Sequence, residues 1–117
     1  MSAKIEVCKV IAAIPYGRVT TYGAIARAAG LGGDARRVGW IIAGLDDDHP
    51  LPCHRVVNVA GYLSGGWAFG HPDRMRQMLE EEGVQFVGEY DVDMRRHFWE
   101  PDLSPTANEM DDFEDIP

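Results

Sequence analysis

Two short amphipathic segments joined by a glycine-rich turn constrain the fold of this chain more than any other feature. In residues 22–29 and again in residues 38–45, apolar side chains recur at the i, i+3, i+4 and i+7 spacing of a helix face. Thr21 and Asp34 are suitable N-caps for these two helices, and Gly30 is suited to end the first. Two short helices connected by a tight turn with glycine are typical of a helix-turn-helix.

Two further helices are predicted outside this motif. The first is capped by Ser2 and runs to about Ile14, and the second starts at Pro72, which fits the first turn of a helix, and ends at Gly83. Their expected core faces are Ile5, Cys8, Ile11 and Ala12 in the first helix and Met75, Met78 and Leu79 in the second.

The remaining patterned segments are short strands. Residues 56–57 are expected to return through a turn at residues 58–61 to a strand at 62–63, and residues 84–86 and 90–94 alternate like edge strands. The predicted fold is therefore α+β: a small helix-turn-helix, winged-helix-like DNA-binding domain with short β-hairpins as wings.

The acidic residues are concentrated at one end of the chain. The net charge is −8, but residues 102–117 contain six acidic residues and no lysine or arginine. Without those six, 13 acidic and 11 basic residues remain, a net charge of about −2. This distribution divides the chain into a domain over residues 1–101 and an acidic tail over residues 102–117, which we expect to be disordered.

Length and composition narrow the class of protein. A chain of 117 residues with 45% hydrophobic residues is sufficient for one domain with a core. Apolar runs are too short for a membrane span, and charges within the first ten residues argue against a signal peptide, so we expect a cytoplasmic protein. Two cysteines are too few for a disulfide framework, and no metal-ligand spacing is present, so no metal and no cofactor are expected.

The outward face of the predicted helix capped by Asp34 favours nucleic-acid binding. At about 100° per residue, this face carries Arg36 as its single charge, together with Gly39, Trp40 and Ala43. Small residues allow the helix backbone to approach a groove closely, and Arg36 would reach into it. The alternative is a solvated helix face with an arginine near its start.

A thiol, an imidazole and a guanidinium occupy consecutive positions at Cys53, His54 and Arg55. Pro52 stiffens the approach to the cysteine, and the two valines that follow favour a strand. A cysteine beside two potential cations suggests a thiolate with a lowered pKa. The alternative is a small buried cysteine beside a surface histidine.

Three segments together resemble a known family. Residues 14–23 (IPYGRVTTYG), 35–39 (ARRVG) and 52–57 (PCHRVV) follow in the order and spacing of the O6-alkylguanine-DNA alkyltransferases, and the resemblance covers about residues 4–101. It implies a repair protein that binds the minor groove through its helix-turn-helix, flips O6-alkylguanine out of the duplex and moves the alkyl group irreversibly to a cysteine.

The resemblance also implies residue roles. Cys53 matches the alkyl acceptor, His54 its base acting through a water, and Glu82 the carboxylate that orients the histidine. Arg36 matches the arginine that replaces the flipped base in the stack, and Tyr22 the tyrosine that crowds the backbone phosphate. Further DNA contacts are expected at Thr21, Ala35 and Gly39, and the substrate pocket at Pro52, Tyr22, Ser64 and Trp67. Arg55 is expected to support the fold.

Two alternatives remain open. Residues 79–84 and 98–101 look more like the alkyltransferase-like proteins, which bind alkylated guanine without repairing it and hand it to nucleotide excision repair; those proteins typically replace the motif cysteine, which this chain retains. A transcription regulator is the third hypothesis, but the face of Arg36 offers few side chains that read bases. The expected partners are double-stranded DNA containing O6-alkylguanine and, in the sensor alternative, excision-repair proteins; we expect a monomer.

Overall fold

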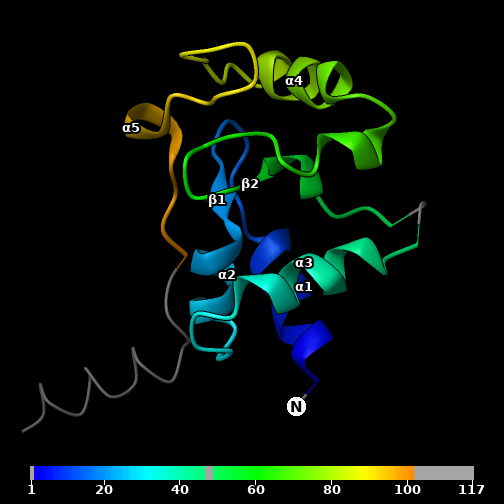
Figure 1. Ribbon diagram of the computed structural model, residues 1–117. Helices are drawn as coiled ribbons and strands as arrows, with labels where there is room; N and C mark the ends of the chain where they lie inside the picture. The colour runs from blue at the N-terminus through cyan, green and yellow to red at the C-terminus, as the bar shows by residue number, and fades with distance from the viewer. Residues whose placement is uncertain (1, 47–48, 102–117) are drawn as a thin grey trace, which may run out of the picture.

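The structure, a computed structural model, describes residues 2–46 and 49–101 (Figure 1). The predicted acidic tail, residues 102–117, lies outside the described residues. In chain order the elements are α1 (Ala3–Ala12), β1 (Thr20–Thr21), α2 (Tyr22–Ala28), α3 (Ala35–Ala43), η1 (Cys53–Arg55), β2 (Val56–Val57), η2 (Gly66–Phe69), α4 (Pro72–Glu81) and α5 (Met94–His97), where η1 and η2 are short 3-10 helices. No helix in these two stretches is both long and apolar enough to cross a membrane.

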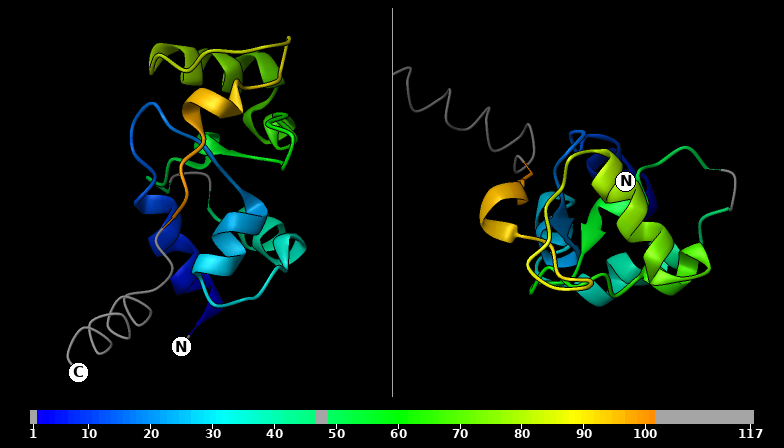
Figure 2. Two further views of the ribbon diagram at one scale, coloured as in Figure 1. Left: turned by 90° about the vertical axis from the view of Figure 1, so that its left-hand side faces the viewer. Right: turned by 90° about the horizontal axis from the view of Figure 1, so that it is seen from above.

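The two-stranded sheet divides the hydrophobic core into two parts. β1 and β2 pair in parallel, with Thr20 opposite Val56 and Thr21 opposite Val57. Successive side chains of a strand point to opposite faces, so Val56 joins a cluster with α1, α2 and α3, whereas Val57 joins a second cluster with α4. The sheet accordingly lies between the α1–α3 layer and α4 (Figures 1 and 2). The predicted α+β class is confirmed.

The helix-turn-helix forms as its capping residues predict. The Thr21 hydroxyl accepts a hydrogen bond from the Ala24 backbone N–H at 3.0 Å, and the Asp34 carboxylate accepts one from Arg37 N–H at 3.2 Å. Gly30 follows α2 with a φ of 82°, in the left-handed region that glycine occupies without steric cost. These local interactions start and end the two helices and set the turn between them.

Strand pairing differs from the predicted hairpins. Residues 56–57 pair with β1 rather than with residues 62–63, and Tyr62 makes an isolated antiparallel bridge with Asp91. Residues 84–86 and 90–94, expected as edge strands, form only one antiparallel bridge with each other, Phe86 with Val92. Such short strands are held by whichever partner buries their apolar face, which a local pattern does not encode.

Two helix predictions need correction. The core face of α1 is formed by Val7 and Ile11, while Ile5 is 54% exposed and Cys8 only half-buried. The stripe is therefore rotated from the predicted one, because α1 packs against α2 and α3 on the side of Val7. Met94, predicted at the end of a strand, begins the short helix α5.

Candidate active site

Cys53 lies at the start of η1, the single tight turn that leads into β2. Pro52 precedes this turn, and the Cys53 backbone N–H donates to the Leu51 carbonyl at 2.8 Å. The strand predicted directly after the motif is confirmed as β2, so the cysteine is held between a rigid turn and the centre of the fold. Its side chain is half-buried and packs against the α1–α3 core cluster.

The Glu82 carboxylate connects the side chains of His54 and Arg55, the two residues that follow Cys53. Its Oε2 lies 2.7 Å from His54 Nε2, and Arg55 donates from Nε to Oε1 at 2.9 Å and from Nη2 to Oε2 at 2.8 Å. The Gly17 backbone N–H also donates to Oε1, at 2.9 Å. Although Glu82 ends a run of three glutamates, its side chain is only 8% exposed. The structure thus joins His54 to Glu82 as the resemblance implies.

The protonation of this pair follows from its contacts. Burial opposes ionisation of Glu82, but the hydrogen bonds from Arg55, Gly17 and His54 outweigh it and lower its pKa to about 2. Glu82 is therefore an acceptor at neutral pH, so a neutral His54 carries its proton on Nε2. That tautomer leaves the lone pair on Nδ1, the nitrogen available to act as a base.

Arg55 links two separate segments of the fold. Besides its hydrogen bonds to Glu82, Arg55 donates from Nη1 to the Ile14 carbonyl at 2.8 Å, just beyond α1, and its guanidinium lies 5.7 Å from the centre of the Tyr16 ring. Arg55 therefore ties the end of α1 to Glu82 at the end of α4. Its charge is compensated by Glu82 rather than offered to the neighbouring thiol.

The predicted low pKa of Cys53 is contradicted. Burial raises the pKa of the thiol to about 11, and the proximity of Cys8 adds to the rise. The physical reason is that the adjacent cation, Arg55, is paired with Glu82, so nothing offsets the loss of hydration of the thiolate. At neutral pH Cys53 is a thiol, so any role as a nucleophile requires the thiolate to be generated first.

A cavity of about 400 Å³ opens beside Cys53 and His54. Tyr22 and Gly39, two of the predicted site residues, line it together with Gly65 and Ala68. Burial raises the pKa of Tyr22, against the lowering effect of a hydrogen bond with Ser64. A Cβ at Gly65 would lie 2.9 Å from the Tyr22 hydroxyl, so only glycine allows this close approach.

Three residues of the predicted substrate pocket lie outside this lining. Pro52 and Ser64 are neighbours in sequence of the lining residues Cys53 and Gly65, and Trp67 is 68% exposed and packs edge-on against His71. Sequence reasoning missed several wall residues, which come from the connection after α3, from η2 and from α4: Leu45, Asp46, His49, Leu51, Phe69, Met75 and Met78. Leu45 and the two methionines carried a signal, as members of predicted core stripes that the structure places partly on the cavity.

The predicted DNA-contacting residues lie on α3 and at the start of α2. Arg36 is exposed on α3, and Gly39, one turn further on the same helix, lines the Cys53 cavity. Ala35, at the first turn of α3, is half-buried. Thr21 is 8% exposed and its hydroxyl is engaged in capping α2, so it positions Tyr22 rather than presenting a free hydroxyl.

Comparisons with known proteins agree with this geometry. Residues 2–84 match the family described as 6-O-methylguanine DNA methyltransferase, DNA binding domain. The chain is 37% identical to alkyltransferase-like protein 1 of Schizosaccharomyces pombe, over 82% of this chain and 93% of that protein. It is 43% identical to the DNA base-flipping protein of Escherichia coli, over 80% of this chain and 71% of that protein.

A solved structure shares the fold over most of its length. The crystal structure of the S. pombe alkyltransferase-like protein in complex with damaged DNA containing O6-carboxymethylguanine superimposes with a TM-score of 0.72 at 35% identity, covering 85% of this chain and 95% of that chain. The family match covers well over half of the chain and carries both the helix-turn-helix and the Cys53 motif. The chain therefore belongs to the 6-O-methylguanine DNA methyltransferase family, as a representative of its DNA-binding domain.

Proposed function

We propose that this protein repairs duplex DNA by extruding O6-alkylguanine into the Cys53 cavity and transferring the alkyl group irreversibly to the Cys53 sulfur. The observation that carries the proposal is the combination, on one cavity, of a thiol with an imidazole whose Nε2 is bonded to a buried carboxylate at 2.7 Å. This arrangement supplies a nucleophile and a base beside a space of about 400 Å³.

Extrusion is required because the O6 atom of a paired guanine is out of reach of a thiol inside the duplex. Flipping a nucleotide costs a few kcal/mol, which contacts with the protein must offset. Arg36 is exposed as the single charge on the face of α3 that also carries Gly39, Trp40 and Ala43, a position from which a guanidinium fills the space the base vacates. Tyr22, on the cavity wall, crowds the backbone and keeps the nucleotide rotated.

The transfer is a displacement at the alkyl carbon. A bond forms between the Cys53 sulfur and that carbon while the bond from the carbon to O6 breaks and its electrons pass to the guanine. The thiol proton leaves through a water to His54 Nδ1, and the guanine takes up a proton from solvent, which restores the normal base. The Glu82 carboxylate stabilises the positive charge that develops on His54. The thioether is stable, so each molecule acts once.

Relatives support the DNA lesion as the substrate. The S. pombe alkyltransferase-like protein has been crystallised with DNA containing O6-carboxymethylguanine, and a Mycobacterium tuberculosis alkyltransferase (36% identical, TM-score 0.62) with DNA. The methylated-DNA–protein-cysteine methyltransferase of the same bacterium is 40% identical over 82 residues, and the matched part of our chain corresponds to 46% of its length. We carry DNA binding and alkyl transfer to this chain on these similarities and on the retained Cys53.

Intact mass spectrometry tests the proposal. After incubation with a duplex containing O6-methylguanine, the protein should gain the mass of one methyl group, and peptide mapping should place it on Cys53. Cys53→Ala should bind the duplex and gain no mass. Cys8→Ala, which changes the other cysteine, should gain the methyl as the wild type does.

A second candidate function is lesion sensing without transfer, with the lesion passed to nucleotide excision repair. Two observations favour it: the raised pKa of Cys53, about 11, and the extensive similarity to an alkyltransferase-like protein. Tight binding to the O6-methylguanine duplex with no mass gain after prolonged incubation would select this function over repair.

A further inference from the structure

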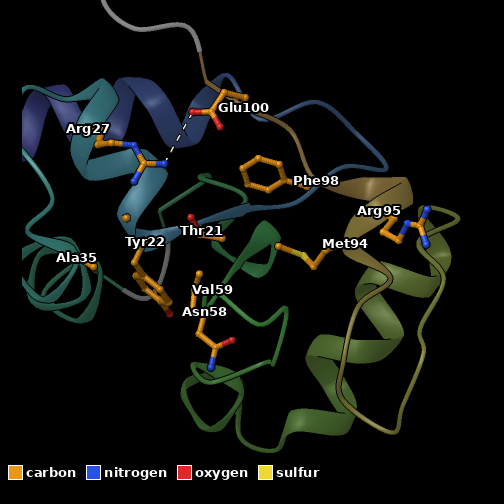
Figure 3. A pocket seen from close by; sticks show the side chains of 11 residues that line it. Thr21, Tyr22, Arg27, Ala35, Asn58, Val59, Met94, Arg95, Phe98 and Glu100 are labelled. Carbon is orange, nitrogen blue, oxygen red and sulfur yellow. Dashed lines mark ion pairs between the residues drawn. The ribbon is translucent and has the colours of Figure 1, made fainter.

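A second cavity, of about 730 Å³, lies beside the proposed alkyl-transfer site (Figure 3). Tyr22 lines both cavities, so the two spaces meet at its side chain. One wall is formed by the start of α2 and by Ala35 of α3, and the opposite wall by residues 94–100 of α5 and the segment after it. The turn at Asn58 and Val59 completes the rim. None of the proposed chemistry at Cys53 uses this space.

We propose that this second cavity binds the sugar–phosphate backbone of the DNA strand whose nucleotide is extruded, with Arg95 as a phosphate-binding residue. The inference rests on the proposed function, because it takes the Cys53 cavity as the place of the flipped nucleotide. That nucleotide stays covalently linked to its neighbours, so its backbone must leave the Cys53 cavity along a residue of the wall. Tyr22 is that residue, and the space behind it is this second cavity.

The apolar part of the cavity suits deoxyribose. Val59 is 89% exposed at the tip of its turn, and it lies across the cavity from Met94 and Phe98 in Figure 3. A fully exposed valine beside a half-buried phenylalanine gains from any contact that removes both from water. The carbon face of a sugar makes such a contact while its phosphates stay at the polar ends of the groove.

Asn58 supplies neutral hydrogen-bond donors. Its Oδ1 accepts the backbone N–H groups of Ala60 and Tyr62, both at 2.9 Å. Because backbone N–H groups only donate, the orientation of the amide is determined, and its two N–H donors remain for a partner outside the turn. A phosphate oxygen is an acceptor of the required kind.

The charges on the two sides of the cavity favour an anion. Within residues 2–46 and 49–101, Arg95 is exposed and makes no ion pair, whereas its neighbour Arg96 lies 3.3 Å from Asp93. Arg27 faces Glu100 at 3.9 Å, and both side chains are more than half exposed, so this pair is weak and open to exchange. Figure 3 places the Arg27–Glu100 pair and Arg95 on opposite sides of the cavity, so a strand that crosses it would bring one phosphate to Arg95 while another competes with Glu100 for Arg27.

The experiment measures the binding of the full chain to two duplexes of one sequence, unmodified and with O6-methylguanine, over a salt series. Arg95→Gln should weaken binding to both duplexes roughly three- to tenfold at low salt, and should reduce the slope of log affinity against log salt by about 0.9, the value for one lost phosphate contact. The matched control is Arg74→Gln, an exposed arginine on α4 outside both cavities, which should leave the slope unchanged.

Removing a negative charge beside the cavity should raise DNA affinity rather than lower it. Glu100→Gln should strengthen binding at low salt about two- to fivefold, because Arg27 then becomes available to a phosphate. The control is Glu89→Gln, because Glu89 is exposed and lies outside the cavity. Equal effects of Arg95→Gln and Arg74→Gln would overturn the proposal, since long-range attraction alone would then explain both.

The two proposals fail in different ways. Methyl transfer to Cys53, measured at saturating DNA, reports on the proposed function and is insensitive to a loss of affinity. If the wild type transfers the methyl group and Arg95→Gln binds DNA as the wild type does, only the proposal of a backbone-binding cavity is overturned. If Arg95→Gln reduces the slope of log affinity against log salt by about 0.9 but the wild type transfers no methyl group, the cavity proposal is supported and the repair function is overturned.

Discussion

Glu82 stabilises the folded state and also contacts the proposed base, because the same carboxylate accepts from Arg55, Gly17 and His54. Its pKa of about 2 in the folded chain lies below the ordinary glutamate value. A carboxyl whose pKa is lowered by folding stabilises the protein above its unfolded pKa, and this contribution is lost as the pH falls toward the folded pKa. The shift corresponds to a contribution on the order of 3 kcal/mol at pH 7, lost between about pH 5 and pH 2.

Glu82→Gln should therefore lower the free energy of unfolding at pH 7 and flatten its fall between pH 5 and pH 3. The reason is that glutamine, unlike the carboxylate, takes up no proton as the pH falls, and it leaves Arg55 as a partly buried, unpaired charge. Urea unfolding at pH 7, 5 and 3 measures both effects. Glu81→Gln, at the neighbouring exposed position, is the control and should retain the wild-type pH dependence; a parallel pH dependence in Glu82→Gln would contradict the assignment.

At the scale of elements, the turn between α2 and α3 decides how the helix-turn-helix presents Arg36. Gly30 has a φ of 82°, and a Cβ there would meet no atom within 4 Å, so the position needs glycine for its backbone and not for space. Gly33, in the same turn, is equally open, but its φ is not in the left-handed region. A Cβ is not crowded at either position, so a difference between substitutions at Gly30 and Gly33 reports on backbone strain alone.

Gly30→Ala should destabilise the protein by about 1–2 kcal/mol, the cost of the left-handed conformation for a residue with a Cβ. At roughly 4–8 °C for each kcal/mol in a domain of this size, thermal unfolding resolves the change. Gly33→Ala should be neutral or slightly stabilising, because it only restricts the unfolded chain. Equal melting temperatures for the two variants would rule out strain at Gly30.

At the scale of the whole molecule, the net charge of the chain opposes its proposed partner. Residues 1–101 have a net charge of about −2 and the six further acidic residues follow Pro101, close in sequence to Glu100 on the second cavity. We expect truncation after Pro101 to raise DNA affinity at low salt, with the gain fading as salt rises, because screening weakens repulsion between the tail and phosphate. A chain in which the six tail acids are replaced by their amides is the matched control and should show the same gain. An unchanged affinity at low salt would make the tail a solubilising segment only.

Several features of this protein follow from the sequence alone because their causes are local. Ser2, Thr21 and Asp34 each cap the helix that follows them, as predicted, since an N-cap needs only a side-chain oxygen three residues before a free N–H. The helical spacing in residues 38–45 and the proline at the start of α4 are equally local signals. The family resemblance added the expected roles of Cys53, His54 and Glu82, which stay predictions.

The tertiary structure alone decided the chemistry of those residues. His54 and Glu82 are 28 positions apart and meet only because α4 ends beside η1, while the parallel pairing of β2 with β1 depends on which core each valine enters. The state of Cys53 was predicted wrongly for the same reason: sequence neighbours suggested nearby cations, but burial and the engagement of Arg55 by Glu82 raise the thiol pKa. Desolvation and charge pairing depend on what surrounds a group in three dimensions, and that environment is assembled here from segments distant in the chain.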